Sequence, residues 1–145
     1  MKKDDSKKYF IESYNLNSSD FIDFNGNLTE SGFYDYAILD NVDIFMEFGL
    51  IEIFNSNKCA PVTFETNIKF KKQIFLNEKI KVRLNSNKIT QRGEWERGFQ
   101  IYNQDKILSA EILSSGRMFD QKKRKVVSPS EEVYINMKKF IDSIS

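Results

Sequence analysis

The sequence predicts an α+β domain in which one long helix covers an antiparallel sheet. Three observations favour this class: β-favouring residues at 9–16, apolar residues at helical spacing from Ser31 to Phe48, and strand-like alternation from Cys59 onward. A chain of 145 residues with 40% hydrophobic and 30% charged residues has the size and composition of one domain. We therefore expect residues 1–145 to form a single domain, with residues 1–8 disordered.

The helix is predicted from four apolar residues that recur three or four positions apart, namely Tyr34, Ile38, Val42 and Phe45. Gly49 follows and is a natural C-terminal stop, because glycine adopts the left-handed conformation that closes many helices. This segment is the only long helix that the body of the chain predicts.

The strands are predicted from two-residue alternation. Apolar and polar residues alternate over 62–70 and again over 80–84, so each segment reads as a strand with one buried face. Residues 91–93 read as a turn, and 95–102 with 107–119 as a hairpin around 103–105. The expected sheet has five or six strands. After Pro129 a shorter helical pattern predicts a C-terminal helical extension over 129–145.

Composition limits the chemistry and the partners. The chain has no His, which excludes Ser-His-Asp and Cys-His catalysis and His-ligated zinc, and Cys59 is the single cysteine, so we expect neither a metal nor a cofactor. A formal net charge of +1 gives no global basic field for nucleic acid. No segment approaches the ~20 apolar residues that span a bilayer. A cytoplasmic protein with no membrane partner is expected.

The most informative segment runs from Asp23 to Tyr36 and reads DFNGNLTESGFYDY. Gly26 allows a backbone turn with positive φ, and Thr29 or Ser31 can each cap a helix that starts just beyond them. The first N–H groups of that helix are unpaired, so they can stabilise a carbonyl oxygen that develops negative charge beside the Asp23 carboxylate. The alternative is an ordinary capped helix after an Asn-Gly turn.

Residues 23–31 resemble the D-Y-N-G-H-M-T-E-S signature of hotdog-fold thioesterases related to 4-hydroxybenzoyl-CoA thioesterase, and the likeness is nearest to the carnitine-operon, betainyl-CoA branch. The resemblance continues through the helix closing at Gly49 and a strand at 62–68, where that branch reads roughly V-E-T-H-I, and extends weakly to about Val126. Two positions that usually hold His are Asn27 and Asn67 here. The resemblance implies a hotdog fold and hydrolysis of a small acyl-CoA thioester. The betainyl likeness suggests a cationic acyl group, for which Trp95, Tyr34 or Tyr36 could supply a π-face. Candidates for the nucleotide end of coenzyme A are Lys71, Lys72, Arg92 and Arg97, and each is otherwise expected to be exposed to solvent.

The implied site combines carboxylates, side-chain amides and main-chain N–H groups. In this site Asp23 would act as general base or nucleophile, and Asn27 would orient the thioester or water. Glu65 is the candidate second acid, with a structural surface role as the alternative. The thioester and its oxygen would be bound by the side-chain amide of Asn67 and by main-chain and side-chain groups of the turn. The turn groups belong to Asn25, Gly26, Leu28, Thr29 and Glu30.

Three further expectations accompany this reading. A small sheet with open edges pairs with a second copy, so we expect a homodimer or a dimer of dimers. The basic run at 122–125 reads as a solvated turn, with contact to coenzyme A phosphates as the alternative. The missing His residues leave open a domain that binds an acyl thioester without hydrolysing it, and a plain interaction module is the third possibility.

Overall fold

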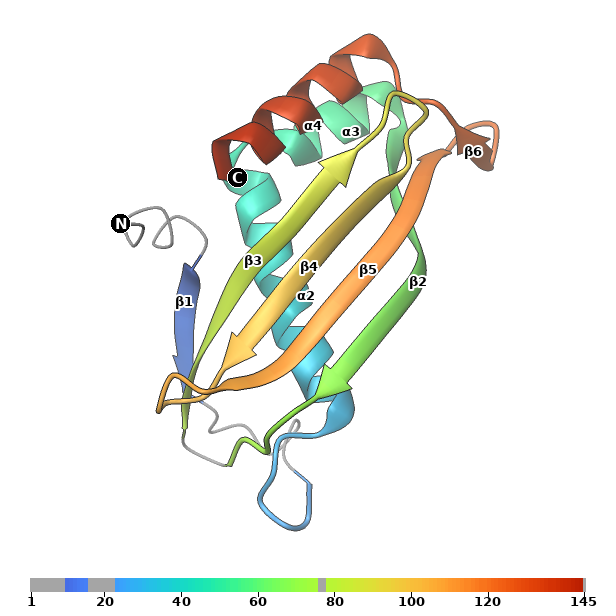
Figure 1. The fold of residues 1–145 in the computed structure, drawn as a ribbon. Coiled ribbons are helices and arrows are strands. Elements are labelled where there is room, and N and C mark those ends of the chain that lie inside the picture. Colours follow the sequence, from blue (N-terminus) through green and yellow to red (C-terminus); the bar gives the residue numbers. More distant parts are fainter. Residues whose placement is uncertain (1–9, 16–22, 76–77, 145) are drawn as a thin grey trace. The chain divides into compact units, whose positions relative to one another are not determined.

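The computed structural model describes residues 10–15, 23–75 and 78–144, and it confirms the α+β class. A six-stranded antiparallel sheet has the strand order β1-β3-β4-β5-β2, and β6 pairs with β5 (Figure 1). The strands are β1 (Phe10–Asn15), β2 (Cys59–Phe70), β3 (Lys79–Ile89), β4 (Trp95–Tyr102), β5 (Leu108–Asp120) and β6 (Lys125–Val127). The helices are α2 (Glu30–Glu47), α3 (Leu50–Asn57) and α4 (Glu131–Ile144).

The chain divides into two compact units that interleave in sequence. The first unit comprises Met1–Asn41, Ile68–Asn85 and Phe99–Ile112. The second unit comprises Val42–Asn67, Ser86–Gly98 and Leu113–Ser145. Helix α2 and strands β2, β3, β4 and β5 each contribute residues to both units, because each crosses a boundary between them.

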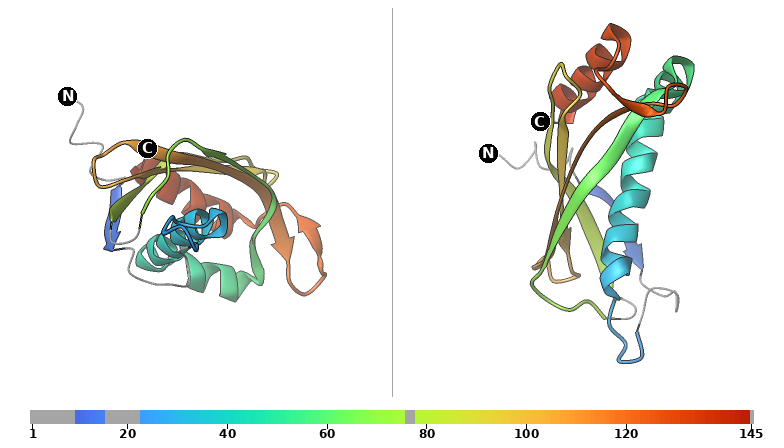
Figure 2. Two further views of the ribbon diagram at one scale, coloured as in Figure 1. Left: turned by 90° about the horizontal axis from the view of Figure 1, so that it is seen from below. Right: turned by 90° about the vertical axis from the view of Figure 1, so that its right-hand side faces the viewer.

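In the first unit, the start of α2 lies on one face of the strands (Figure 2). Phe33 on α2 is 3% exposed and meets Phe70 on β2 edge to face, with ring centroids 5.4 Å apart. The predicted inner face of β3 is confirmed, because Ile80, Val82 and Leu84 are all buried. Alternation along β3 therefore places its polar residues on the opposite face.

The second unit contains helix α3, which the sequence analysis did not predict. Gly49 has φ 72°, so it ends α2 as expected, but it also serves as the N-cap of α3. Leu50 and Phe54 bury the inner face of α3, and Lys58 closes it in the left-handed conformation with φ 54°. Gly49 is thus a corner between two helices, whereas the sequence analysis treated it as the end of helical structure.

The C-terminal extension packs as a helix of the second unit beside α3 (Figures 1 and 2). Ser130 caps α4, since its Oγ accepts the N–H of Val133 at 3.3 Å. Phe140 contacts the rings of Phe45 and Phe48, with centroids 5.4 and 5.0 Å apart. The predicted helix is confirmed, and these contacts make it part of a core.

The expectation of a half-buried β2 is wrong over residues 63–67, which are all exposed. Phe64 keeps 64% of its surface open although its alternation with polar neighbours predicted burial. The cause is position: β2 ends the strand order and has β5 as its only neighbour in the described sheet. Alternation shows which residues share a face, but it does not show whether anything covers that face.

The predicted turns are confirmed. Gly93 has φ 94°, and its N–H donates to the carbonyl of Thr90 at 2.9 Å. Asn103 folds the β4–β5 turn, because its Oδ1 accepts the N–H groups of Asp105 and Ile107.

None of the helices in the described parts of the chain is long and apolar enough to cross a membrane. The expected disorder of residues 1–8 lies outside the described residues.

Candidate functional site

The Asp23 turn, residues 23–28, lies in the first unit and is held by its own aspartate. Oδ1 of Asp23 accepts the N–H of Asn25 at 2.8 Å and that of Asn27 at 3.0 Å. The main chain closes the same turn, since the N–H of Asp23 donates to the carbonyl of Asn27 and the N–H of Gly26 donates to that of Asp23. Gly26 has φ 82°, a conformation that side chains disfavour. Among the described residues, Oδ2 of Asp23 accepts no hydrogen bond.

Helix α2 starts directly after this turn, and Thr29 is its cap. Oγ1 of Thr29 accepts the N–H of Gly32 at 3.0 Å, and its carbonyl accepts the N–H of Phe33. Of the two capping residues that the sequence allowed, the structure therefore uses Thr29. Ser31 lies in the first helical turn, with its Oγ 3.4 Å from Thr29 Oγ1.

Most of the expected main-chain donors are already engaged. Besides the bonds within the turn, the N–H of Leu28 donates to the carbonyl of Ile74 at 2.6 Å. Across the described residues, the open donors at the start of α2 are the N–H groups of Thr29, Glu30 and Ser31. The sequence analysis named Thr29 and Glu30 and missed Ser31, because it could not decide which residue caps the helix.

The side chain of Asn27 contains a polar atom that no described residue satisfies. Its Oδ1 is buried, and none of the described residues donates a hydrogen bond to it. A buried amide oxygen without a donor costs free energy, so such a group commonly meets a water or a ligand. The main chain of Asn27 forms an antiparallel bridge with Phe75, which fixes the residue beside the segment 71–75.

The remaining predicted site residues belong to the second unit. Glu65 and Asn67 lie on β2, and both are exposed. Glu65 lines an open groove of about 460 Å³ with Phe64, Lys88, Glu96 and other residues of the second unit. The residues from Asp23 to Glu30 are thus brought together in the first unit, whereas Glu65 and Asn67 share a strand in the second.

Trp95 and Arg97, considered as contacts for a cationic acyl group and for a nucleotide, are both buried in the second unit. The Arg97 guanidinium lies over the Trp95 ring at 4.7 Å from its centroid. Trp95 Nε1 donates to the carbonyl of Arg117 at 3.0 Å. The expected surface position of Arg97 is therefore wrong, and one face of the Trp95 ring is already covered by a cation.

The basic run at 122–125 is exposed, as predicted: residues 122–124 lie in the turn between β5 and β6, and Lys125 begins β6. Asp120 holds this turn, because its Oδ1 accepts the N–H groups of Lys122 and Lys123 at 2.8 Å. The hydrogen bond from the main chain of Lys123 lowers the pKa of Asp120 more than any other contact does.

Burial raises the pKa of the Cys59 thiol, and the negative charge of Asp120 raises it further by a smaller amount. Cys59 itself is buried.

Comparison with solved structures gives similar folds among proteins described as thioesterases and among hypothetical proteins. A putative oleoyl thioesterase from Lactobacillus plantarum matches with a TM-score of 0.79 and 21% identity. The match covers 90% of this chain and 50% of the oleoyl thioesterase, so this chain spans about half the length of that protein. The probable thioesterase YbaW from Escherichia coli has a TM-score of 0.80 and 10% identity, covering 92% and 98% of the two chains. A hypothetical protein from Staphylococcus aureus, solved in complex with CoA, matches with a TM-score of 0.75 and 12% identity, and the match covers 92% of this chain and 84% of that protein.

Comparison with curated proteins gave no significant match. The sequence model of the Thioesterase-like superfamily matches residues 17–137, which include the Asp23 turn, all of α2 and strands β2 to β6. The likeness to the betainyl-CoA branch stays a prediction. The chain therefore belongs to the Thioesterase-like superfamily, and its fold is the hotdog fold.

Proposed function

We propose that this protein hydrolyses an acyl-CoA thioester at the Asp23 turn. The observation that carries the proposal concerns the two oxygens of the Asp23 carboxylate. Oδ1 accepts the hydrogen bonds that hold the turn, whereas Oδ2 accepts no hydrogen bond from the described residues. The open N–H groups of Thr29, Glu30 and Ser31 follow in the same unit. A thioester carbonyl bound at these donors would develop its negative charge at the positive end of α2.

Two routes use these groups. As a general base, Asp23 takes a proton from water, the resulting hydroxide adds to the carbonyl carbon, and the tetrahedral intermediate expels the thiolate, which recovers the proton. As a nucleophile, Asp23 adds to the carbonyl itself, the thiolate leaves, and water opens the mixed anhydride. Both routes give a carboxylic acid and free coenzyme A. Attack of water on the Asp23 carbon of the anhydride would transfer ¹⁸O from labelled water to Asp23, which peptide mass spectrometry detects.

Asn27 supports the same site through its side-chain amide. Its Oδ1 is buried without a donor among the described residues, so a bound water or substrate N–H would satisfy it. An amide can orient water or a thioester, but it cannot carry a proton at neutral pH. Glu65 and Asn67 keep their proposed roles as second acid and substrate contact.

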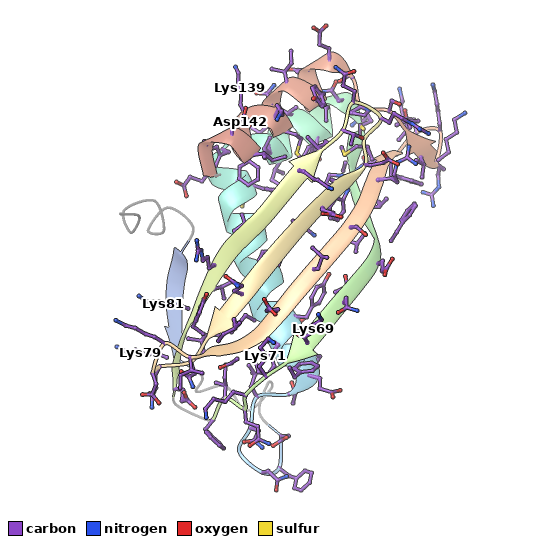
Figure 3. All side chains as sticks on the ribbon, viewed as in Figure 1. Lys69, Lys71, Lys79, Lys81, Lys139 and Asp142 are labelled. Atoms are coloured by element: carbon purple, nitrogen blue, oxygen red, sulfur yellow. The ribbon has the colours of Figure 1, made fainter. Side chains whose placement is uncertain are left out.

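The nucleotide end of coenzyme A has candidate contacts in the first unit. Lys69 and Lys71 lie at the end of β2 (Figure 3). Lys71 is 3.6 Å from Glu111 and keeps 43% of its side chain exposed, and Lys72 is exposed beside it. Surface lysines bind phosphate as point charges, so their contribution should fall as salt concentration rises.

We also propose that two copies pair through β2. This strand ends the sheet order, and its residues 63–67 are exposed. Among the described strands β2 pairs with β5 alone, and a long edge strand with an exposed Phe64 is a template for strand pairing. Sedimentation equilibrium would give a dimer mass, or a tetramer mass for a dimer of dimers, and a monomer at micromolar concentration would reject the proposal.

The test of hydrolysis is release of free thiol from a panel of acyl-CoAs. The second candidate is a domain that binds an acyl thioester without hydrolysing it, which Asn27 in the usual His position favours. Thermal stabilisation by intact acyl-CoA without thiol release would support this binder. Gain of hydrolysis in Asn27→His would support it further, since the fold would then lack only a proton carrier.

A further inference from the structure

Glu78, the residue before β3, is a buried acid that takes no part in the two routes of hydrolysis. It is 8% exposed and lies in the first unit, with the Asp23 turn. Its Oε2 accepts the N–H of Phe75 at 2.9 Å, and its Oε1 accepts the N–H of Gln104 at 3.3 Å. Its own N–H donates to the carbonyl of Phe75 at 3.2 Å. These three bonds satisfy a buried carboxylate and join residue 75 to the β4–β5 turn.

The segment that Glu78 holds is the one that contacts the Asp23 turn. The carbonyl of Ile74 accepts the N–H of Leu28 at 2.6 Å, and the main chain of Phe75 bridges Asn27. The two bridged residues each donate their N–H to a carboxylate. That of Asn27 goes to Oδ1 of Asp23, and that of Phe75 goes to Oε2 of Glu78. Because N–H groups of such an antiparallel pair point away from the partner strand, the two carboxylates hold the bridge from opposite sides.

The two ends of the segment 71–75 are fixed in different ways. At one end, the N–H groups of Lys71 and Lys72 donate to the carbonyl of Ser109 on β5, at 2.8 and 3.2 Å. At the other end, the side chain of Ile74 is fully buried, whereas that of Phe75 is 49% exposed. Packing therefore anchors residue 74, and the main chain of residue 75 is held chiefly by the carboxylate of Glu78.

We infer that Glu78 is a positioning residue for hydrolysis at the Asp23 turn, because it fixes the main chain that Asn27 and Leu28 contact. The inference rests on the proposed function and adds a residue to the same site. Oδ2 of Asp23 and the open N–H groups of residues 29–31 must face one thioester carbonyl at the same time. Misplacement of a reacting group by about 1 Å can lower a rate about 100-fold, so a turn without this support should bind substrate but convert it slowly.

Glu78→Gln tests the inference, because it keeps the size of the side chain and removes one acceptor. A glutamine has a single carbonyl oxygen, so it can accept the N–H of Phe75 or that of Gln104, but not both. On the acyl-CoA that the wild-type protein hydrolyses fastest, kcat should fall at least about tenfold. The S-alkyl-CoA thioether of the same chain length, which lacks the carbonyl, should bind with unchanged Kd and full stoichiometry in titration calorimetry. Simple destabilisation would instead lower the stoichiometry together with kcat.

Amide hydrogen exchange measures the support of the turn without any turnover. In Glu78→Gln the N–H of Leu28 should exchange about tenfold faster, because its acceptor, the carbonyl of Ile74, lies on the released segment. Ser130→Ala is the matched control, since it also removes one side-chain acceptor of a main-chain N–H, that of Val133, but lies in the second unit. It should lower the unfolding free energy and leave both kcat and the exchange of Leu28 within about twofold of wild type.

Gln104→Pro guards against misfolding of Glu78→Gln, because it keeps the carboxylate and deletes only the N–H that Oε1 accepts. The N–H of Lys106 donates to the carbonyl of Asn103, so residue 104 is the second residue of a β-turn, where proline is favoured. Gln104 is also exposed. This variant should lower kcat and speed the exchange of Leu28, with full thioether stoichiometry.

Two outcomes would overturn the inference and leave the proposed hydrolase standing. One is a kcat within about twofold of wild type in Glu78→Gln or in Gln104→Pro. The other is a loss of kcat that is matched by an equal loss of thioether stoichiometry. Absence of thiol release from every acyl-CoA by the wild-type protein would refute the proposed function, and this inference with it.

Discussion

Asp23 has two proposed roles, which are to hold the turn and to act in hydrolysis. Asn can take over the first role but not the second, and Ala can take over neither, so the two substitutions separate the roles. Asp23→Ala removes the acceptor of two N–H groups, of which that of Asn25 is exposed and that of Asn27 is partly buried. Water can serve the exposed donor, so the loss is mainly one partly buried bond, about 1–3 kcal/mol of unfolding free energy. Asp23→Asn keeps an oxygen in the Oδ1 position and weakens two charge-assisted bonds, which costs about 1 kcal/mol or less.

In Asp23→Ala and Asp23→Asn, the loss of turnover should not follow the loss of unfolding free energy. An amide neither accepts a proton from water nor attacks a thioester, so both variants should lose at least about 100-fold in kcat/KM. Free-thiol release measures turnover, and urea denaturation gives the unfolding free energy. The expected pattern is a nearly normal denaturation midpoint with lost activity in Asp23→Asn. Retained activity in Asp23→Asn would show that Asp23 only shapes the turn.

Other predictions follow from single contacts elsewhere. Gly116→Ala should destabilise by at least about 2 kcal/mol in urea denaturation, since its new Cβ would collide with the carbonyl of Val62 and stand 2.7 Å from a Trp95 ring carbon; a loss below 1 kcal/mol would contradict this packing. Thr29→Ala should lower the unfolding free energy by about 1 kcal/mol, and Thr29→Ser, which keeps the capping oxygen, should not. Iodoacetamide should label native Cys59 far more slowly than unfolded chain at pH 8, because burial raises the pKa of its thiol; equal rates would contradict its burial.

The sequence predicted the strands well and the corner between the helices poorly. Alternation located β3 and the β4–β5 hairpin because each has one face buried within the described sheet. Residues 50–57 gave no helix signal of useful length, since eight residues span little more than two turns. The short helix forms because Gly49 turns the chain in the left-handed conformation and Phe54 is buried, with its ring against Phe45.

The conformation of the Asp23 turn was predicted, whereas the N–H groups that it leaves open were predicted only in part. The motif placed a carboxylate before a capped helix, and the turn, Gly26 and Thr29 all take the conformations that this required. Local sequence could not show that the N–H of Leu28 is used by Ile74, because that partner lies 46 residues away. Nor could it show that Phe75 pairs with Asn27, since such pairing depends on tertiary register.

The Asp23 turn explains how the fold accommodates Asn at residue 27, where the resemblance to the thioesterase signature predicts His. The turn uses only the main chain of this residue: its N–H donates to Oδ1 of Asp23, its carbonyl accepts the N–H of Asp23, and its bridge to Phe75 is also main-chain. Asn in place of His therefore leaves the motif recognisable and the helix start intact. What changes is the side chain, whose buried oxygen lacks a donor among the described residues. Geometry at this turn and proton transfer at this site can accordingly vary independently, so hydrolysis must be measured on the chain itself.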